Sequence, residues 1–493
     1  MAAALERELK LRAPAAFSLA RQELHIEPYR IAPPGRRRLH TIYYDTDDLR
    51  LTRWGASLRF RNGDGWIVKL SQPHTGGASY RTEHTFDAAP QTVPFDALRL
   101  IRGLLRHAGI GRVAELRTLR TSRDVFLADR KIAEVVEDDV RVVWPAGQAR
   151  RFRQIEIELT NDAPDDALDA LYHGLRKCGA GEPSPVAKIV LALGADAAED
   201  ELRPPSIDTR CTAGDAARAA LAASVKRLLA TDPLLRADMQ PDAIHDARVA
   251  VRRLRSDLRT FEPLFDAEWS RELRERLRRL SSVFGAARDA DVLLDEVAVY
   301  ASSLPEIDRR DLGPALAPLR AHRERGYAGV AASLAEPQYI DLLDALVSAA
   351  QSPHFNPRAL EAARDVAAEL HAPVWKKLRK RVAKAGSLPS DSALHRMRIK
   401  AKNARYAAEA LAPVCGAEAA KLAACLEALQ TELGAQHDAV HACDALRRHG
   451  ADSPHAFVLG ELTAVAYAHS VSRRDGWRSL WTAAQTQHKR FAP

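Results

Sequence analysis

The sequence has no long apolar run. Charge enters at Glu6, before an apolar segment of signal-peptide length could form, and no later stretch supplies the roughly 18 consecutive apolar residues of a membrane-spanning helix. Cysteine is scarce, and the five cysteines are scattered without a paired CxxC spacing, which indicates neither a disulfide framework nor a zinc site. These absences predict a cytoplasmic protein with reduced thiols and no membrane partner.

Charged residues are abundant, and positive charge is in excess. They make up 28% of the chain, and the formal net charge is +8, so the protein should favour anionic partners. The total does not distinguish nucleic acid, an acidic membrane surface and condensed phosphates, because these differ in how the charge must be distributed. The length of 493 residues is too great for one ordinary core and indicates two or three structural units.

The sequence changes its pattern near residue 200. Up to about 193 it alternates polar and apolar residues in short runs typical of strands, interrupted by helical periods over 95–107 and 164–178. After an acidic, proline-containing stretch it turns to Ala, Leu and Arg in long helical periods. We therefore predict an α+β protein with an N-terminal antiparallel closed β-barrel over 1–193, a linker over 194–207 and an all-α domain over 208–493.

The helical part contains a repeat. A histidine is followed by basic residues at +3, +7 and +10 in two places: His245, Arg248, Arg252 and Arg255, then His395, Arg398, Lys402 and Arg405. Each set is followed at a similar distance by a G-x-x-R/H-D segment, Gly285 to Asp289 and Gly434 to Asp438. The repeat predicts two related helical bundles, about 208–350 and 351–493.

Several strands of the N-terminal part carry acids and bases on one face. Alternate side chains of a strand share a face, and the pattern occurs at Glu6, Glu8 and Lys10, at Arg59 and Arg61, at Arg81 and Glu83, and at Glu156 and Glu158. If the sheet closes, these faces line a tunnel while the apolar faces pack outward. Carboxylates are hard ligands for Mg²⁺ or Mn²⁺, and Arg and Lys neutralise phosphate oxygens. The pattern therefore predicts a polyanion held together with metal.

The segment Glu6-Arg7-Glu8-Leu9-Lys10 resembles the ExExK signature of the CYTH superfamily of triphosphate tunnel enzymes. Further marks of that family follow in its order: Tyr44-Asp45-Thr46, Leu58-Arg59-Phe60-Arg61, Trp66-Ile67-Val68-Lys69, Arg81-Thr82-Glu83, Arg120-Thr121-Ser122-Arg123, Asp138, Glu156-Ile157-Glu158 and Lys188. ExExK alone is a weak motif, but the ordered series is specific. One departure is that Ile189 follows Lys188, where the family often has an aromatic residue.

The resemblance implies a role for each position. Divalent metals, Mg²⁺ or Mn²⁺, would be held by Glu6, Glu8, Glu83, Asp138, Glu156 and Glu158. The triphosphate would be held by Lys10, Arg59, Arg61, Lys69, Arg81, Arg120, Arg123 and Lys188. The catalytic residues would be Glu6, Glu8, Lys10 and Glu158. The sequence leaves open the choices between Asp138 and Asp139, and between Arg120 and Arg123.

The implied reaction is hydrolysis of inorganic triphosphate to pyrophosphate and phosphate. This substrate needs no pocket for a base or thiazole ring, and the aromatics Tyr43, Tyr44, Trp54 and Trp66 are expected to pack outside the barrel or at its rim. Thiamine triphosphatase and class IV adenylate cyclase activities are the alternatives within the enzyme class. A third reading is a polyphosphate-binding scaffold without activity. The oligomeric state stays open.

Each histidine pattern of the repeat lies on one side of an α-helix and forms a cationic strip. These strips resemble the two histidine helices of the CHAD family, a helical domain often found behind a CYTH domain. The segments Gly285 to Asp289 and Gly434 to Asp438 resemble the paired G-x-x-R/H-D turns of that family. The resemblance implies binding of inorganic polyphosphate by His245, Arg248, Arg252, Arg253, Arg255, Arg288, His395, Arg398, Lys402, Arg405 and His437. Nucleic acid is disfavoured because the strips lack interleaved aromatics. A protein that binds polyphosphate would associate with polyphosphate granules in the cytoplasm, and this is the location we expect.

Overall fold

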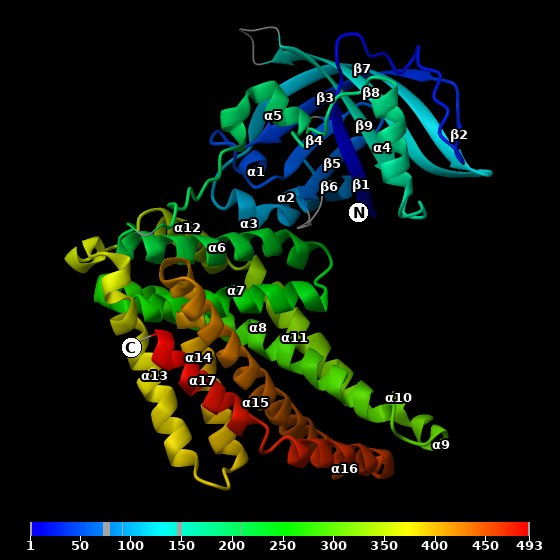
Figure 1. Ribbon diagram of the computed structural model, residues 1–493. Helices are drawn as coiled ribbons and strands as arrows, with labels where there is room; N and C mark the ends of the chain where they lie inside the picture. The colour runs from blue at the N-terminus through cyan, green and yellow to red at the C-terminus, as the bar shows by residue number, and fades with distance from the viewer. Residues whose placement is uncertain (1, 72–78, 91, 145–149, 209, 492–493) are drawn as a thin grey trace. The chain divides into compact units, whose positions relative to one another are not determined.

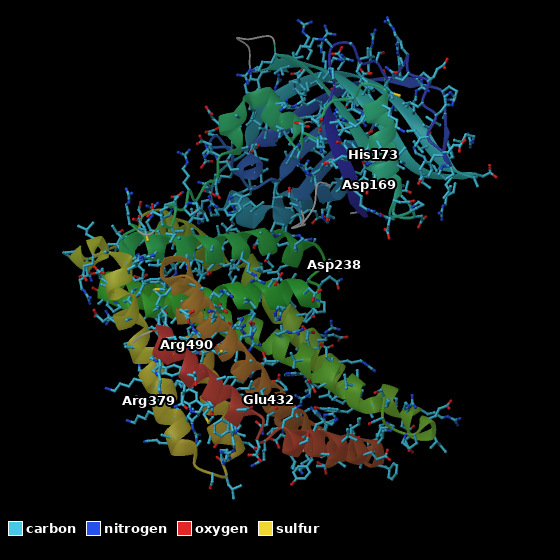
Figure 2. The ribbon with its side chains drawn as sticks, viewed as in Figure 1. Asp169, His173, Asp238, Arg379, Glu432 and Arg490 are labelled. Atoms are coloured by element: carbon cyan, nitrogen blue, oxygen red, sulfur yellow. The ribbon has the colours of Figure 1, made fainter. Side chains whose placement is uncertain are left out.

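The computed structural model describes residues 2–71, 79–90, 92–144, 150–208 and 210–491 (Figure 1). The backbone of Glu6 belongs to the first strand, but its side chain lies outside the described residues, as do those of its neighbours in 2–5 and of 79–80. The chain divides into two compact units, Met1–Glu201 and Leu202–Pro493. The boundary falls inside the predicted linker, and the units match the predicted α+β class: a curled antiparallel sheet first, helices afterwards.

The first unit is built on one antiparallel sheet. Its strands are β1 (Ala2–Arg12), β2 (Arg30–Ile31), β3 (Gly35–Asp45), β4 (Ser57–Arg61), β5 (Gly65–Ser71), β6 (Ser79–Phe86), β7 (Gly111–Leu127), β8 (Arg130–Trp144) and β9 (Arg151–Leu159). The strand order is β2-β7-β3-β4-β5-β6-β1-β9-β8, and β8 also pairs with β7. Each strand except the short β2 therefore has a paired neighbour on both sides, and the sheet curls strongly (Figure 1).

Alternation along the strands separates two environments. In β1, Leu9 and Leu11 join an apolar core with Ile155 and Ile157 of β9, whereas the intervening Glu8 and Lys10 face the other way. Helix α4 (Ala167–Lys177) covers this core with Leu171 and other apolar side chains. Burying the apolar face of each strand is the main stabilising term, at about 25 cal/mol per Å² removed from water. The polar face of each strand points to the inside of the curled sheet.

Short helices complete the first unit: α1 (Arg50–Arg53), α2 (Phe95–Leu100), α3 (Arg102–Leu105), α5 (Lys188–Leu193) and the 3₁₀ turn η1 (Ala195–Ala198). The helix predicted over 95–107 is therefore two helices that meet at Ile101. Helix α5 packs on an apolar cluster at one part of the curled interior, where Ile189 contacts a group that includes Tyr43 and Leu116. This packing fixes the position of Lys188, the first residue of α5.

The second unit is helical. Its helices are α6 (Ala213–Ala237), α7 (Pro241–Thr260), α8 (Ala267–Ala301), α9 (Glu306–Arg309), α10 (Leu312–Ala315), α11 (Ala317–Ala335), α12 (Pro337–Gln351), α13 (Ala363–Ala385), α14 (Asp391–Cys415), α15 (Ala417–Gly450), α16 (Ala456–Ser472) and α17 (Trp477–Phe491), with 3₁₀ turns η2 (Glu262–Leu264) and η3 (Pro357–Leu360). The N-termini of α6 and α14 are capped by Thr212 and Ser390, which satisfies otherwise unpaired amides.

Corresponding helices of the repeat pack against one another. Helix α7 packs between α6 and α8, α14 packs between α13 and α15, and the two sets meet where α7 contacts α14 and α8 contacts α15. The predicted turns at Gly285 and Gly434 are wrong, because both segments lie inside the long helices α8 and α15. A glycine inside a helix costs only about 1 kcal/mol, which the surrounding Ala and Leu tolerate.

None of the described helices is long and apolar enough to cross a membrane.

Candidate functional site

A cavity of about 930 Å³ lies inside the curled sheet. Its described lining includes nine basic residues, Lys10, Arg37, Arg53, Arg59, Arg61, Lys69, Arg81, Arg120 and Lys188. It also includes six acids, Glu8, Asp64, Glu83, Glu134, Glu156 and Glu158. Such a density of opposite charges inside a protein requires close pairing, because an isolated buried charge is very costly.

Strand register brings the residues of β1 and β9 together. Glu8 is the cross-strand neighbour of Glu158, and Lys10 is the neighbour of Glu156. The Lys10 ammonium pairs with Glu8 and lies 3.7 Å from Glu156 Oε1. Burial lowers the pKa of Lys10, and the two carboxylates oppose that shift. This edge of the cavity therefore holds two carboxylates around one lysine, with Glu158 beside Glu8 on the neighbouring strand.

A buried network continues from Glu156. Arg120 binds Asp138 through two hydrogen bonds of 2.8 and 2.7 Å and lies 3.4 Å from Glu156. Lys188 pairs with Glu156 and lies 2.9 Å from Asp138 Oδ2. Burial alone would raise the pKa of Glu156, but the charges of Lys188, Lys10 and Arg120 hold it well below its usual range. All four groups are therefore charged at neutral pH.

Arginines and a lysine gather on strands β4, β5 and β6. The Glu83 carboxylate pairs with Lys69 and lies 3.5 Å from Arg59. Burial would raise the pKa of Glu83, but Lys69 and Arg59 lower it. Arg61 donates to Thr41 Oγ1 at 3.1 Å and to Asp64 at 3.1 Å, and Arg81 lies 3.6 Å from Glu8. This side presents guanidinium groups whose planar donors match phosphate oxygens.

The structure separates the two pairs that the sequence left open. Arg120 points into the cavity, whereas Arg123, three residues along β7, donates to the carbonyl oxygens of Leu19 and Gln22 at 3.1 and 2.9 Å. Asp138 is 1% exposed and binds Arg120, whereas Asp139 pairs with Arg151 at the surface. The expectation that Arg123 reaches the substrate is therefore corrected by strand parity, since odd-numbered spacings lie on opposite faces.

The Tyr44-Asp45-Thr46 segment acts through the backbone. The Asp45 carboxylate accepts hydrogen bonds from the amides of Thr46, Leu51 and Thr52 and from the Thr52 hydroxyl, at 2.7 to 2.9 Å. It thereby holds α1 in the position from which Thr52 and Arg53 line the cavity. The motif thus shapes the site without exposing its own carboxylate.

Four charged lining residues were missed by the sequence prediction: Arg37, Arg53, Asp64 and Glu134. Arg37 could have been found, because it shares strand parity with Tyr43 and is the cross-strand neighbour of Arg120. Glu134 is the neighbour of Glu158 across β8 and β9 and lies 3.7 Å from Arg37. Their positions depend on register between strands, which spacing within one strand does not reveal.

The donor chemistry of the cavity suits a hard cation, although the side chains are arranged in ion pairs. Among the residues that the structure describes, no group of three His, Cys, Asp or Glu side chains is placed to hold a metal ion. Glu8, Glu156 and Glu158 nevertheless occupy neighbouring register positions and offer the oxygen ligands that Mg²⁺ and Mn²⁺ prefer. Asp138 is fully engaged with Arg120 and Lys188.

The second unit has a cationic groove of about 310 Å³. Six basic residues line it: Arg252, Arg255, Arg259, Lys377, Lys400 and Lys402. Its described lining contains no acid, in contrast to the cavity of the sheet. Burial and the neighbouring arginines, Arg252 first, lower the pKa of Lys402 to about 7. Unbalanced positive charge of this kind is suited to a polyanion.

The G-x-x-R/H-D segments hold arginines of the strips. Arg248 donates to the Gly285 carbonyl at 3.2 Å and pairs with Asp289 at 2.6 Å. In the second repeat a Cβ at Gly434 would lie 3.3 Å from the guanidinium of Arg398, which also lies 3.8 Å from Asp438. In the second repeat Gly434 therefore leaves room for Arg398, and Asp438 orients that arginine.

The other residues expected to bind polyphosphate lie outside the described lining of the groove. The His395 and His437 rings lie 4.1 Å apart, and burial lowers the pKa of His437 to about 4. Burial likewise lowers the pKa of His245, with Arg288 adding to the effect. Arg253 and Arg405 are not among the described lining of the groove, and both pair with Glu409. Direct contact of Arg253 and Arg405 with the polyanion stays a prediction.

The fold and sites define a class: a curled antiparallel sheet with a densely charged interior, followed by a helical domain with paired cationic strips. Residues 4–183 match the family model for the CYTH domain, and residues 219–447 match that for the CHAD domain. The protein belongs to these two families, which confirms both resemblances seen in the sequence. CYTH superfamily members typically act on phosphoanhydrides and depend on metal, generally Mg²⁺ or Mn²⁺.

Known proteins include several that are similar to this chain. An uncharacterized Mycobacterium tuberculosis protein, MT2285, is 30% identical over 449 residues, which span 83% of this chain and 82% of the relative. Among solved structures, PptA from Streptomyces chartreusis is 21% identical with a TM-score of 0.47, covering 55% of this chain and 99% of its own. The CHAD domain from the plant Ricinus communis is 24% identical with a TM-score of 0.46, covering 58% of this chain and 95% of its own.

Proposed function

We propose that the curled sheet acts as a closed tunnel and hydrolyses inorganic triphosphate to pyrophosphate and phosphate. The observation that carries the proposal is the lining of a single cavity by nine basic and six acidic side chains. Arg59, Arg61, Lys69 and Arg81 would contact the phosphate oxygens, because they lie on neighbouring strands and face one space. Charge neutralisation at preorganised donors is the main protein contribution to phosphoryl transfer.

Carboxylates on β1 and β9 would hold Mg²⁺ or Mn²⁺. We assign Glu8, Glu156 and Glu158 to this role, with Glu6 on the same strand and Glu83 opposite. When bound, the cation would neutralise the phosphates and supply an activated water. Asp138 is better suited to orienting Arg120 and Lys188 than to ligating metal, since its oxygens are committed to those two groups.

Inorganic triphosphate is favoured over nucleoside or thiamine triphosphates by the positions of the aromatics. Trp66 is fully buried against Tyr44 and Phe60, and the Trp54 ring nitrogen donates to Glu201 at 2.6 Å. Tyr43 lines the cavity, so the expectation that it packs outside the barrel or at its rim is wrong. The other three aromatics considered in the sequence are not part of the described lining. A stacking platform for a base or thiazole ring would require more aromatic side chains in the cavity lining.

The test is phosphate release from triphosphate, ATP, thiamine triphosphate and long-chain polyphosphate, each with Mg²⁺ or Mn²⁺. Turnover should be highest with inorganic triphosphate and should vanish with a chelator. Preference for ATP or thiamine triphosphate would instead support one of the two alternative activities. Absence of release from every substrate, with a folded protein, would leave the scaffold hypothesis.

We further propose that the groove of the helical unit binds inorganic polyphosphate. Several Arg and Lys side chains aligned against a phosphate chain release its counterions, so that binding should weaken steeply with salt. Filter binding of long-chain polyphosphate with duplex DNA as competitor tests this. Displacement by DNA at equal phosphate concentration would show a general polyanion binder. Through this groove the protein would associate with polyphosphate granules in the cytoplasm.

A further inference from the structure

Tyr406 lies where the strips of the two repeats meet. It belongs to α14, is 3% exposed, and lines the cationic groove. Its hydroxyl oxygen accepts a hydrogen bond of 2.7 Å from Nε of Arg252, which belongs to α7. This contact joins the two repeats directly at the groove.

Three guanidinium groups surround the Tyr406 ring. Their central carbons lie 5.5, 5.2 and 5.5 Å from the ring centroid for Arg252, Arg253 and Arg405. The negative face of an aromatic ring attracts such cations, which here would otherwise repel one another. Arg253 and Arg405 are both turned to Glu409, at 2.7 and 2.6 Å. Arg252 contacts the ring too but lines the groove.

The Tyr406 hydroxyl accepts the hydrogen bond from Arg252, so it can still donate one of its own. Because its oxygen accepts from Arg252, its own hydroxyl proton can be directed into the groove. The groove is otherwise lined mainly by cations, so this proton is a neutral, directional donor for a phosphate oxygen. Fixing the Nε of Arg252 also leaves the two terminal nitrogens of that guanidinium for phosphate, and a fixed side chain loses less entropy on binding.

We infer that Tyr406 positions Arg252 for phosphate and donates a hydrogen bond to the bound chain, so that one residue couples the two repeats in polyphosphate binding. The inference rests on the proposed polyphosphate function of the groove. It goes further in naming a neutral residue, outside both cationic patterns, as a determinant of affinity. Replacing Tyr406 with phenylalanine should leave the salt dependence of polyphosphate binding unchanged, since this substitution removes no charge.

The experiment compares Tyr406→Phe with a matched control, Tyr339→Phe, in the full chain. Tyr339 is also 3% exposed, donates to Asp232 at 2.8 Å and has the Arg236 guanidinium 5.7 Å from its ring. It belongs to α12, where it faces α6, and is not part of the described lining of the groove. Binding of long-chain polyphosphate should weaken on the order of tenfold for Tyr406→Phe, the usual effect of losing hydrogen bonds to charged groups. Tyr339→Phe should leave the affinity unchanged.

A second variant separates positioning from packing. Arg252→Lys keeps the charge but removes the Nε donor, so Tyr406→Phe added to it should cost clearly less than it costs alone. Additive losses, or equal losses for Tyr406→Phe and Tyr339→Phe, would overturn the inference while leaving the groove intact. If the unaltered protein binds no polyphosphate, then the proposed function fails and the inference fails with it.

Discussion

Asp138 and Asp139 are adjacent on β8 but have different surroundings. Asp138 faces the cavity side and binds Arg120 and Lys188, whereas Asp139 binds Arg151 near the surface. Burial would raise the pKa of Asp138, but Lys188 and Arg120 lower it. Removing one negative charge from such a network leaves buried cations without their partner. The consequence is a loss of position for the arginine and the lysine rather than a loss of one contact.

We predict that Asp138→Asn lowers turnover of triphosphate on the order of 100-fold, since small displacements of positioned groups have effects of that size. Asp139→Asn should stay close to the unaltered protein. The measurement is steady-state phosphate release at saturating metal, with thermal unfolding of both variants as the control for folding. Equal activities in two folded variants would show that the network does not serve catalysis.

We predict that Lys402 makes the proposed polyphosphate binding sensitive to pH. It is surrounded by Arg252, Arg398, Arg248 and Arg255, and its pKa is lowered to about 7 by burial and by these cations. A bound polyanion favours the charged form and so raises that pKa. Binding therefore takes up a proton above pH 7, and affinity should fall as pH rises from 7 toward 9, with little change from this group below 7.

The check is polyphosphate affinity measured between pH 6 and 9 at constant ionic strength. Lys402→Arg should remove most of the dependence in the range 7 to 9, because arginine stays charged throughout. A persisting slope in that variant would assign the titration to another group.

At the scale of elements, equivalent positions of the repeat have different roles. Arg255 of α7 and Arg405 of α14 are both the +10 residue of their patterns. Arg255 lines the groove and donates to Ser281 at 3.2 Å. Arg405 instead pairs with Glu409 and Glu427. Sequence periodicity assigns both to one face of a helix, but it does not show which acids a neighbouring helix presents.

We predict that Arg255→Glu weakens polyphosphate binding at least tenfold, because it places an acid among the groove cations. Arg405→Glu should change affinity much less, although it should lower the unfolding temperature by putting like charges beside Glu409. Filter binding and thermal unfolding of both variants test this. Equal losses of affinity would mean that the two strips contribute symmetrically.

The sequence was most informative where one strand or helix determines the answer. Alternation in β1 and β9 correctly paired Glu8 and Lys10 with an apolar opposite face. It could not supply Arg53, which reaches the cavity because Asp45 holds α1 in place. The family resemblance implied a turn at Gly434, but this glycine lies inside α15 and accommodates Arg398. A glycine of this kind and one that ends a helix look alike in the sequence.

At the scale of the whole molecule, every residue proposed for triphosphate hydrolysis belongs to the first unit, Met1–Glu201. Glu201 should be kept in any truncation, because it pairs with Arg106 and accepts from Trp54. We predict that residues 1–201 alone hydrolyse triphosphate with at least half the turnover of the full chain. Circular dichroism and phosphate release check this. A folded but inactive fragment would mean that the helical unit completes the site.

The pairing of β1 with β9 has a consequence for the order of events during biosynthesis. Strand β1 has β6 and β9 as its neighbours, so Glu8 and Lys10 meet Glu156 and Glu158 only after residue 159 has been made. Contacts of such long sequence separation form slowly. The acids and bases of β1 and β9 therefore gain one another late in sheet assembly, and no nascent chain that ends before β9 can hold a complete site.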